Sequence, residues 1–190
     1  MERTPLWLGA LACAIAIFAA VPGVAAARGK APETRCVKAA ATVRDMVASR
    51  LSARAALLCL LNRERHKQGL APLAENERLR QAAFLHARWM VRHRNFTHFR
   101  PDGVDLVDRL RAVKYIPSSG GWLVGENIGY GLPRRSSPAD QVRYWMASPA
   151  HRANILNPRF RAAGLGIFSG TPRNSIPKGA TYAIDFGSRR

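Results

Sequence analysis

The sequence predicts an α+β protein in which helices come first and a small antiparallel sheet comes last. Apolar residues recur at steps of three and four between Leu79 and Met90, which is the period of an amphipathic helix. Residues 163–168 and 182–187 are instead short apolar runs around a loop of Gly, Pro and Asn, which indicates two strands. The hydrophobic fraction, 47% of 190 residues, is normal for a globular protein and excludes wholesale disorder.

Residues 1–27 have the features of a secretory signal peptide. A basic start is followed by an apolar run from Leu6 to Val21 and by a small-residue exit site at Ala25-Ala26-Ala27, as such peptides require. The apolar core, about 15 residues, is shorter than the roughly 20 that a membrane-spanning helix needs. We therefore expect a secreted protein, extracellular or periplasmic, with no transmembrane segment after cleavage. The remaining length suits one domain and excludes a large multidomain enzyme.

Two cysteines outside the signal region, Cys36 and Cys59, are predicted to form a disulfide. An even number of cysteines in an exported chain favours a bridge over two buried free thiols, which is the alternative. The bridge would close a loop of about 24 residues and would stabilise the fold by roughly 3 kcal/mol in the chain-entropy model. It would fasten residues 28–51, the predicted N-terminal linker or arm, onto a domain predicted for residues 52–190.

Capping residues predict where the helices begin. The first firm helix is expected to start at the N-cap Ser52 and to stop at Gly69, a residue typical of helix ends. A second helix is expected from the N-cap Asn76 to near Arg94, packed on the first. A short third helix is predicted over residues 104–113.

The middle of the chain holds a glycine-rich segment and a strong helix start. In residues 122–131, four of the last seven are Gly or Asn, and this backbone freedom predicts a segment that lines a site rather than a plain strand. Ser137 before Pro138, with an acidic residue in the next turn, predicts an N-capped helix. That helix is expected to end at Ser148, where Pro149 opens another helical turn.

The chain is strongly basic, with 30 Lys and Arg against 12 Asp and Glu and a formal charge of +18. Arginine binds phosphate and carboxylate groups through two parallel hydrogen bonds, so anionic envelope polymers and anionic lipids are candidate partners. The alternative is a charged, solvated face that serves solubility alone. Nucleic acid is not an expected partner, because the basic clusters lack the interleaved aromatic residues that stack on bases.

Three residues flanked by glycines, aromatics and turns are candidates for a shared cleft: His98, Glu126 and His151. Two imidazoles and a carboxylate could hold a divalent cation such as Zn²⁺ with a vacant position for water, or could exchange protons with a bound group. Their spacings, 28 and 25 residues, match no short metal motif. The alternative is structural: the imidazoles bind backbone carbonyls, and the carboxylate accepts from buried amides.

Other constellations favour no chemistry. Ser148 and His151 are three residues apart, but a proline intervenes and no Gly-x-Ser-x-Gly motif is present, which disfavours a serine nucleophile. His86 and His93 are seven apart on one predicted helix. We expect His86 to pack in the core and His93 to be exposed.

Six short motifs follow one another along the chain between Leu57 and Gly187. They are Leu61-Asn62-x-x-Arg65, Phe96-x-His98, Gly125-Glu126-Asn127-Ile128, Trp145-Met146-x-Ser148-Pro149-x-His151-Arg152-x-Asn154-Ile155-Leu156, Gly164-x-Gly166 and Tyr182-x-x-Asp185-Phe186-Gly187. Together they resemble the bacterial branch of the CAP superfamily, the cysteine-rich secretory, antigen 5 and pathogenesis-related proteins, also called SCP-domain proteins.

The resemblance implies a three-layer α-β-α sandwich with a central antiparallel sheet and an open cleft. The family pattern places two His and two Glu in that cleft, and three of those places are taken here; Ser148 stands where many eukaryotic members have the second Glu. The implied ligand-binding cleft consists of His98, Glu126, Asn127, Ser148 and His151. Among these residues, His98, Glu126 and His151 are the candidates for catalysis. The implied metal ligands are His98 and His151.

No common reaction unites the resembled family, so the fold alone assigns no function. The expected function is a non-catalytic secreted binding module whose cleft takes a small, lipidic or metal ligand. The alternative is a metal-assisted, protease-like hydrolase in which Glu126 or a histidine activates water on Zn²⁺. A third hypothesis is direct binding to an anionic polymer, with the cleft purely structural.

Overall fold

The computed structural model describes residues 36–41, 47–173 and 178–190, so the signal-peptide prediction for residues 1–27 lies outside the described residues. The helices are α1 (Val47–Lys67), α2 (Glu77–Arg92), α3 (Leu106–Ala112), α4 (Pro138–Ala147) and α5 (Pro149–Ile155), with a 3-10 turn η1 (Pro133–Arg135). The strands are β1 (Ala74–Glu75), β2 (Trp122–Gly131), β3 (Ala162–Ser169) and β4 (Ala180–Arg189).

The strands form one sheet in the order β1-β3-β4-β2. The three long strands are antiparallel, with β4 between β3 and β2. The two-residue strand β1 pairs in parallel with the start of β3, a strand that the sequence did not predict. Strand β2 is therefore an edge strand of the sheet in the part of the chain that the structure describes.

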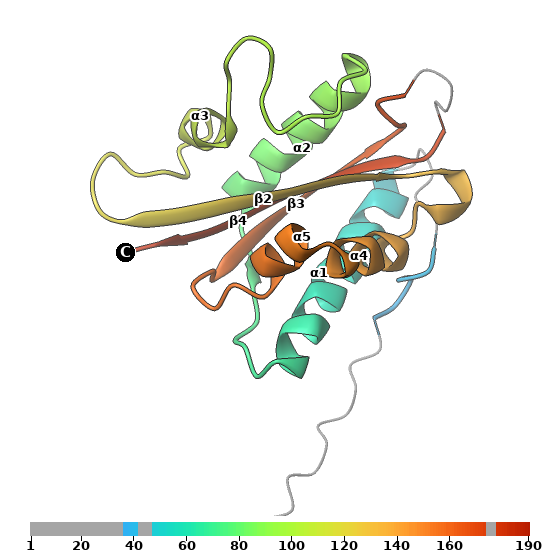
Figure 1. Cartoon of the computed structure of the whole chain (residues 1–190), viewed down its shortest axis with the longest axis horizontal. Coiled ribbons are helices and arrows are strands. Elements are labelled where there is room, and N and C mark those ends of the chain that lie inside the picture. Colours follow the sequence, from blue (N-terminus) through green and yellow to red (C-terminus); the bar gives the residue numbers. More distant parts are fainter. Residues whose placement is uncertain (1–35, 42–46, 174–177) are drawn as a thin grey trace, which may run out of the picture. The chain divides into compact units, whose positions relative to one another are not determined.

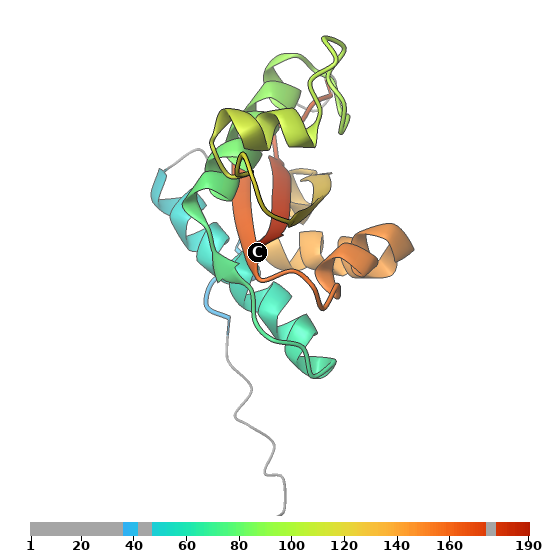
Figure 2. The same cartoon turned by 90° about the vertical axis from the view of Figure 1, so that its left-hand side faces the viewer.

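Helices cover both faces of the sheet (Figure 1). Helix α2 packs on β3 and β4 on one face, with α3 beside it, while α1, α4 and α5 pack on the other face. The view turned by 90° shows the same sheet between the two sets of helices (Figure 2). The predicted three-layer α-β-α sandwich is thereby confirmed. The expected packing of the second helix on the first is wrong, because the sheet takes up the apolar face of α2.

Side chains along a strand point alternately to the two faces of the sheet, so the same strands contribute to a hydrophobic cluster on each face. Leu165, Ile184 and Phe186 are buried in the cluster that includes α1, α4 and α5. Ala183 turns to the other face, where it packs with residues of α2. Gly166 allows this helix to come close, because a β-carbon there would lie 2.2 Å from the carbonyl carbon of Ala83 in α2.

Most of the predicted helix boundaries are confirmed. Asn76 caps α2 by accepting hydrogen bonds from two backbone N–H groups of its first turn. Ser137 caps α4 in a reciprocal capping box with Asp140, as such sequences favour. The predicted start of the first helix at Ser52 is wrong, because α1 already begins at Val47. Its end at Lys67, just before Gly69, agrees with the predicted stop.

The glycine-rich segment 122–131 is a regular strand, so the expectation that it would not be a plain strand is wrong. All ten residues of β2 have partners in β4, and none of its glycines has a positive φ. Gly129 instead makes room for a neighbour, since a β-carbon there would lie 2.2 Å from Nε2 of Gln141 in α4. Gly125 likewise makes room for Asn154 and Phe160, so the glycines of β2 serve close packing against the edge strand.

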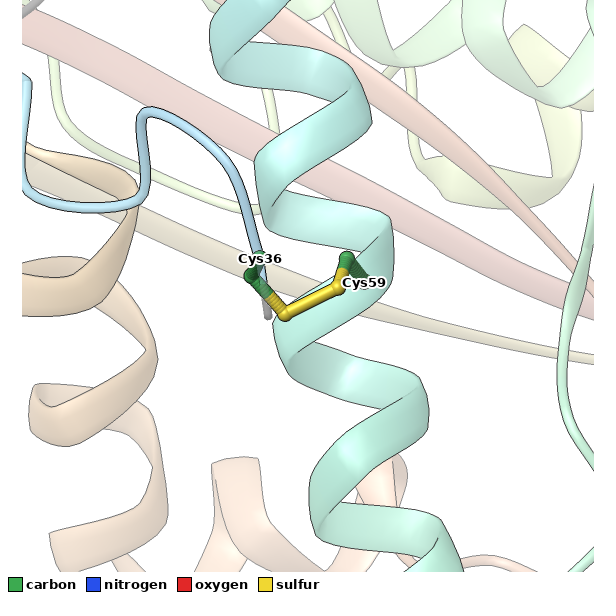
Figure 3. The surroundings of a disulfide bond; sticks show 2 residues. All are labelled: Cys36 and Cys59. Atoms are coloured by element: carbon green, nitrogen blue, oxygen red, sulfur yellow. A yellow bond between two sulfur atoms is a disulfide. The ribbon is translucent and has the colours of Figure 1, made fainter. Parts of the chain in front are cut away.

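The predicted disulfide between Cys36 and Cys59 is present, with the two α-carbons 5.6 Å apart. Figure 3 shows it joining the arm to the middle of α1. The arm also contacts α4, because the carbonyl oxygen of Ala39 accepts a hydrogen bond of 2.9 Å from the backbone N–H of Ala139. The bridge and this bond fasten residues 36–41 to the layer that contains α1 and α4.

No helix in residues 36–41, 47–173 and 178–190 combines the length and the apolar character needed to cross a membrane.

Candidate functional site

The three candidate residues come from three separate elements that meet along the edge strand. Glu126 lies in the middle of β2, His98 lies in the loop between α2 and α3, and His151 lies in α5. Nδ1 of His98 is 2.7 Å from Oε1 of Glu126. The structure therefore brings two of the predicted residues into direct contact, although they are 28 positions apart in the chain.

The carboxylate of Glu126 is buried and has partners on both oxygens. His98 contacts Oε1, and Nη2 of Arg109 donates to Oε2 at 2.5 Å. Only 3% of the Glu126 side chain and 4% of that of Arg109 are exposed. Burial alone would raise the pKa of Glu126, but the hydrogen bond from His98 and the charge of Arg109 outweigh it and lower the pKa. Glu126 is thus an ionised, paired group.

Arg109 connects this carboxylate to the loop that carries His98. Its Nη1 donates to the backbone carbonyl of His98 at 3.0 Å, while its Nη2 binds Glu126. A guanidinium presents several donors in one plane, so a single side chain can hold both groups in fixed relation. Helix α3, which the capping box at Asp105 begins, supplies this arginine.

Two further titratable residues, His86 and Asp185, are buried beside the carboxylate of Glu126. His86 of α2 is fully buried, as predicted, and its Nε2 is 2.9 Å from the carbonyl oxygen of Thr97 and 3.8 Å from Oε2 of Glu126. Burial lowers the pKa of His86 to about 4, although the nearby Glu126 opposes this. The imidazole is therefore neutral near pH 7 and donates from Nε2 to Thr97.

Asp185 lies directly opposite Glu126 in the register of β4 and β2. Its side chain is fully buried, and neither carboxyl oxygen has a hydrogen-bond partner in the part of the chain that the structure describes. Burial, reinforced by the negative charge of Glu126, raises the pKa of Asp185 well above its usual range. The protonated, neutral form is the one that this position favours.

The ring of His98 reaches the surface. Its side chain is 45% exposed, and the carboxylate of Glu126 can only accept, so Nδ1 of His98 carries the proton of the bond between them. This leaves Nε2 as the atom that can meet a ligand. Glu126 and Arg109 together hold that atom in place.

His151 is attached to the opposite side of the edge strand. The side chain of Asn127 donates to the carbonyl oxygen of His151 at 3.0 Å and accepts from Nδ2 of Asn154 at 2.9 Å. Nδ2 of Asn154 also donates to the backbone oxygen of Glu126 at 3.1 Å. Because neighbouring residues of a strand point to opposite faces, Asn127 anchors α5 while Glu126 faces α2.

The His151 ring is half-buried, and its Nδ1 is buried without a hydrogen-bond partner among the described residues. Burial lowers the pKa of His151, and the charge of nearby His98 lowers it further. Ser148, at the junction of α4 and α5, is half-buried and makes no capping hydrogen bond from its side chain. A ligand contact by Ser148 or by the fully buried Asn127 stays a prediction.

The predicted zinc ligands do not form a complete donor set. Within the described ranges, no three His, Cys, Asp or Glu side chains lie together so that they could hold a metal ion. His98, whose side chain is 45% exposed, and His151, whose Nδ1 is buried without a partner among the described residues, offer at most two ligands. Protein zinc sites need at least three. Metal binding by this pair stays a prediction for which the geometry provides no third ligand.

Sequence reasoning missed Arg109 and Asp185 as members of this cluster. Arg109 is one of several charged residues in a short amphipathic segment, and nothing local distinguishes it from an exposed arginine. Asp185 did carry a signal, because it is the one charge in the apolar run 182–187 that was predicted as a strand. A charge in a buried strand requires a partner or a proton.

A mainly apolar cavity lies on another side of α5. It has a volume of about 360 Å³ and is lined mainly by Met146, Pro149, Arg152, Ala153 and Leu156. The α5 members of this set recur at steps of three and four, so they share one face of the helix. Residue 151 falls on another face, and the cavity is therefore separate from the imidazole of His151.

Comparisons with known proteins decide the family. The family model described as CAP, cysteine-rich secretory protein family, matches residues 58–183, well over half of the chain. The chain belongs to the CAP family. The resemblance predicted from the ordered motifs is thereby confirmed.

The curated relative YkwD of Bacillus subtilis, an uncharacterized protein, is 36% identical over 109 residues. The match covers 56% of this chain and 39% of YkwD. The chain thus spans about two fifths of the length of this relative, and nothing in the relative's name assigns an activity.

Three solved structures have a similar fold. An extracellular SCP-domain protein from Bacillus anthracis is similar with a TM-score of 0.59 and 26% identity, over 72% of this chain and 40% of that chain. An outer surface protein from Borrelia burgdorferi has a TM-score of 0.58 at 20% identity, over 70% of this chain and 90% of its own. A cysteine-rich secretory protein from Staphylococcus aureus has a TM-score of 0.54 at 21% identity, over 72% and 38%.

Proposed function

We propose that this CAP protein is a secreted, non-catalytic binding module whose ligand contacts the rings of His98 and His151 beside the edge strand. Glu126 acts in this proposal as a positioning residue. It orients the ring of His98, so that Nε2 points away from the carboxylate and toward the ligand.

The observation that supports a binding role over a catalytic one is the pairing of both oxygens of Glu126. A general base needs an oxygen free to accept a proton and a pKa near the working pH. Glu126 is 3% exposed, is bound by His98 and Arg109, and has a lowered pKa. These properties suit a fixed anchor and leave the carboxylate a weak base toward a bound molecule.

Secretion is part of the same proposal. The similar structures from Bacillus anthracis and Borrelia burgdorferi are described as extracellular and outer-surface proteins. The disulfide between Cys36 and Cys59 is a bond that persists in oxidising compartments. Both observations agree with the signal-peptide features of residues 1–27.

The ligand classes expected from the sequence are small, lipidic or metallic. The exposed Nε2 of His98 suits a polar group or a metal ion as a contact. A lipid would instead need an apolar cavity, and the one between α4 and α5 is separate from His151. A ligand that engages both histidines is therefore the more direct expectation.

Native mass spectrometry of the exported chain, purified without chelator and then titrated with Zn²⁺ or with oleate, tests the proposal. We expect saturable binding of at least one probe to the wild-type chain, weakened at least tenfold in His98→Ala and His151→Ala. His66→Ala, at the exposed end of α1, is the matched histidine control and should bind as the wild type does.

Two results would overturn the proposal. One is the absence of saturable binding of either probe, or binding that both cleft variants retain at wild-type strength. The other is turnover of a protein or ester substrate that the wild-type chain performs and His98→Ala does not, which would favour the hydrolase alternative.

A further inference from the structure

A second cavity lies at the end of the sheet, where β2 begins and β4 reaches the C-terminal end marked in Figure 1. It has a volume of about 400 Å³. Four arginines line it, Arg159, Arg161, Arg189 and Arg190, together with Trp122. None of the residues that line it is acidic.

These arginines have no carboxylate partner among the described residues. Some arginines elsewhere in the described chain pair with a nearby acid, as Arg80 does with Glu77 and Arg143 with Asp140. No such ion pair involves any of the four arginines of the cavity. Four arginines thus line one hollow that no acidic side chain lines.

The fold holds the guanidinium groups of two of these arginines in place. That of Arg189 lies 4.8 Å from the ring centre of Tyr115 and donates to the Tyr115 carbonyl oxygen at 3.3 Å. Nη1 of Arg161 donates to the carbonyl oxygens of Phe160, at 3.1 Å, and Pro158. Each of these bonds uses one guanidinium nitrogen, so other N–H groups of both side chains remain available to a ligand.

Hydrogen bonds from α1 also hold the loop that carries Arg159 and Arg161. The fully buried Arg65 of α1 donates to the carbonyl oxygen of Asn157 at 2.9 Å and to that of Phe160 at 3.3 Å. A preformed arrangement of donors loses less conformational entropy when it binds. The shape of the cavity is therefore fixed by the fold before a ligand binds.

We infer that this arginine cavity is an oxyanion-binding site, which takes a phosphate or carboxylate group through the guanidinium groups of Arg159, Arg161 and Arg189. Guanidinium groups bind both anions through paired hydrogen bonds. Trp122, 40% exposed at the rim, offers an apolar surface to the carbon skeleton that bears the anion. The site is distinct from the cleft at Glu126, four residues farther along β2.

The oxyanion has two possible sources, a free small anion or the repeating unit of an anionic polymer. Titrations with inorganic phosphate and with a galacturonate trimer, each at constant ionic strength, distinguish them. Isothermal calorimetry gives the affinity, and the Nε–Hε signals in ¹H–¹⁵N NMR spectra identify the arginines that respond. Phosphate binding indicates a free anion, whereas binding of the trimer alone indicates a polymer unit.

The decisive comparison is between two double variants that remove the same charge. Arg159→Gln with Arg189→Gln should weaken binding at least tenfold. Arg134→Gln with Arg135→Gln changes two exposed arginines of η1 and should change it less than twofold. The single variant Arg159→Gln, an exposed loop residue, provides a readout that does not depend on the contact of Arg189 with Tyr115, and should bind at least threefold more weakly.

Equal weakening in both double variants would overturn the inference, because the general positive field would then explain binding. The absence of saturable binding of either probe would also overturn it. His98→Ala should leave anion binding unchanged. A failure at the arginine cavity is thereby separate from a failure of the proposed cleft function.

Discussion

The buried cluster around Glu126 and the arginine cavity at the end of the sheet treat charge in opposite ways. In the cluster, Glu126 meets His98 and Arg109, and its side chain is 3% exposed. In the cavity, four arginines have no carboxylate partner among the described residues. The charges of the buried cluster are paired within the protein, whereas we infer that those at the cavity meet an anion from outside.

This difference separates the residues that position side chains, in the Glu126 cluster, from those that we infer to bind an anion, in the arginine cavity. A charge taken out of water needs a compensating group, so each member of the Glu126 cluster depends on the others for stability. Charges at an open cavity remain solvated and contribute little to folding. Substitutions in the two regions should therefore have different effects, large on stability in the first and small on stability but large on anion binding in the second.

The largest effect is expected from Arg109→Met. The variant leaves the buried carboxylate of Glu126 without its guanidinium partner, and breaking a buried ion pair in this way costs about 3–5 kcal/mol. Urea unfolding followed by circular dichroism measures the loss. Arg111→Met, an exposed position on the same helix, should change stability by less than about 0.5 kcal/mol. A loss below about 1 kcal/mol in Arg109→Met would contradict the comparison.

The next effect is a pH dependence due to His86. Because burial lowers its folded-state pKa from 6.5 to about 4, the unfolded chain takes up a proton in this window and the folded chain does not. The His86 contribution to stability should fall as the pH decreases from 6.5 to 4, by up to roughly 3 kcal/mol.

The difference in unfolding free energy between wild type and His86→Gln, measured at several pH values, isolates this contribution. The difference should become less favourable to the wild type as the solution is acidified. His93→Gln, an exposed ring on the same helix, is the matched control. A difference that does not vary with pH would show that His86 is not buried in its neutral form.

A smaller, opposite pH dependence is expected at Asp185. Its raised pKa means that the folded chain keeps a proton that the unfolded chain releases above about pH 4. Folding then becomes less favourable as the pH increases. Asp185→Asn removes this cost and should stabilise the protein by about 1–2 kcal/mol at pH 7, with less effect at pH 4. Destabilisation at pH 7 would indicate an ionised, paired Asp185.

The smallest effect on stability is expected at the cavity. Arg159→Gln should change the free energy of unfolding by less than about 0.5 kcal/mol, because the side chain is exposed and has no ion pair among the described residues. Thermal and urea unfolding measure it. A loss above about 1 kcal/mol would mean that the cavity arginines support the fold, which would remove the contrast with the Glu126 cluster.

Local signals predicted the parts of the fold that local interactions determine. The N-caps Asn76 and Ser137 were predicted because each satisfies orphan N–H groups of its own helix. The start of α1 was not, because several residues before Ser52 are also compatible with a helix and α1 extends back to Val47. The glycines of β2 predicted a site lining rather than a plain strand, although they reflect the close approach of other side chains and backbone, such as Gln141 of α4 at Gly129.

In the candidate site, too, the sequence predicted only the residues that have a local signal. His98, Glu126 and His151 were identified by their neighbours and by the ordered motifs, and the structure brings His98 onto Glu126. Arg109 could not be found, because its role arises only when α3 packs beside β2. A charged residue in an amphipathic segment has the same local pattern whether it is solvated or buried against a distant carboxylate.

The protonation state of His98 tests the central claim, that Glu126 is an anchor which fixes this ring, most directly. A long-range ¹H–¹⁵N NMR spectrum of the histidine-labelled chain at pH 8 reports which ring nitrogen carries the proton. The account predicts a proton on Nδ1 of His98, donated to Glu126, with Nε2 unprotonated and free for a ligand. A proton on Nε2 with Nδ1 unprotonated would contradict it.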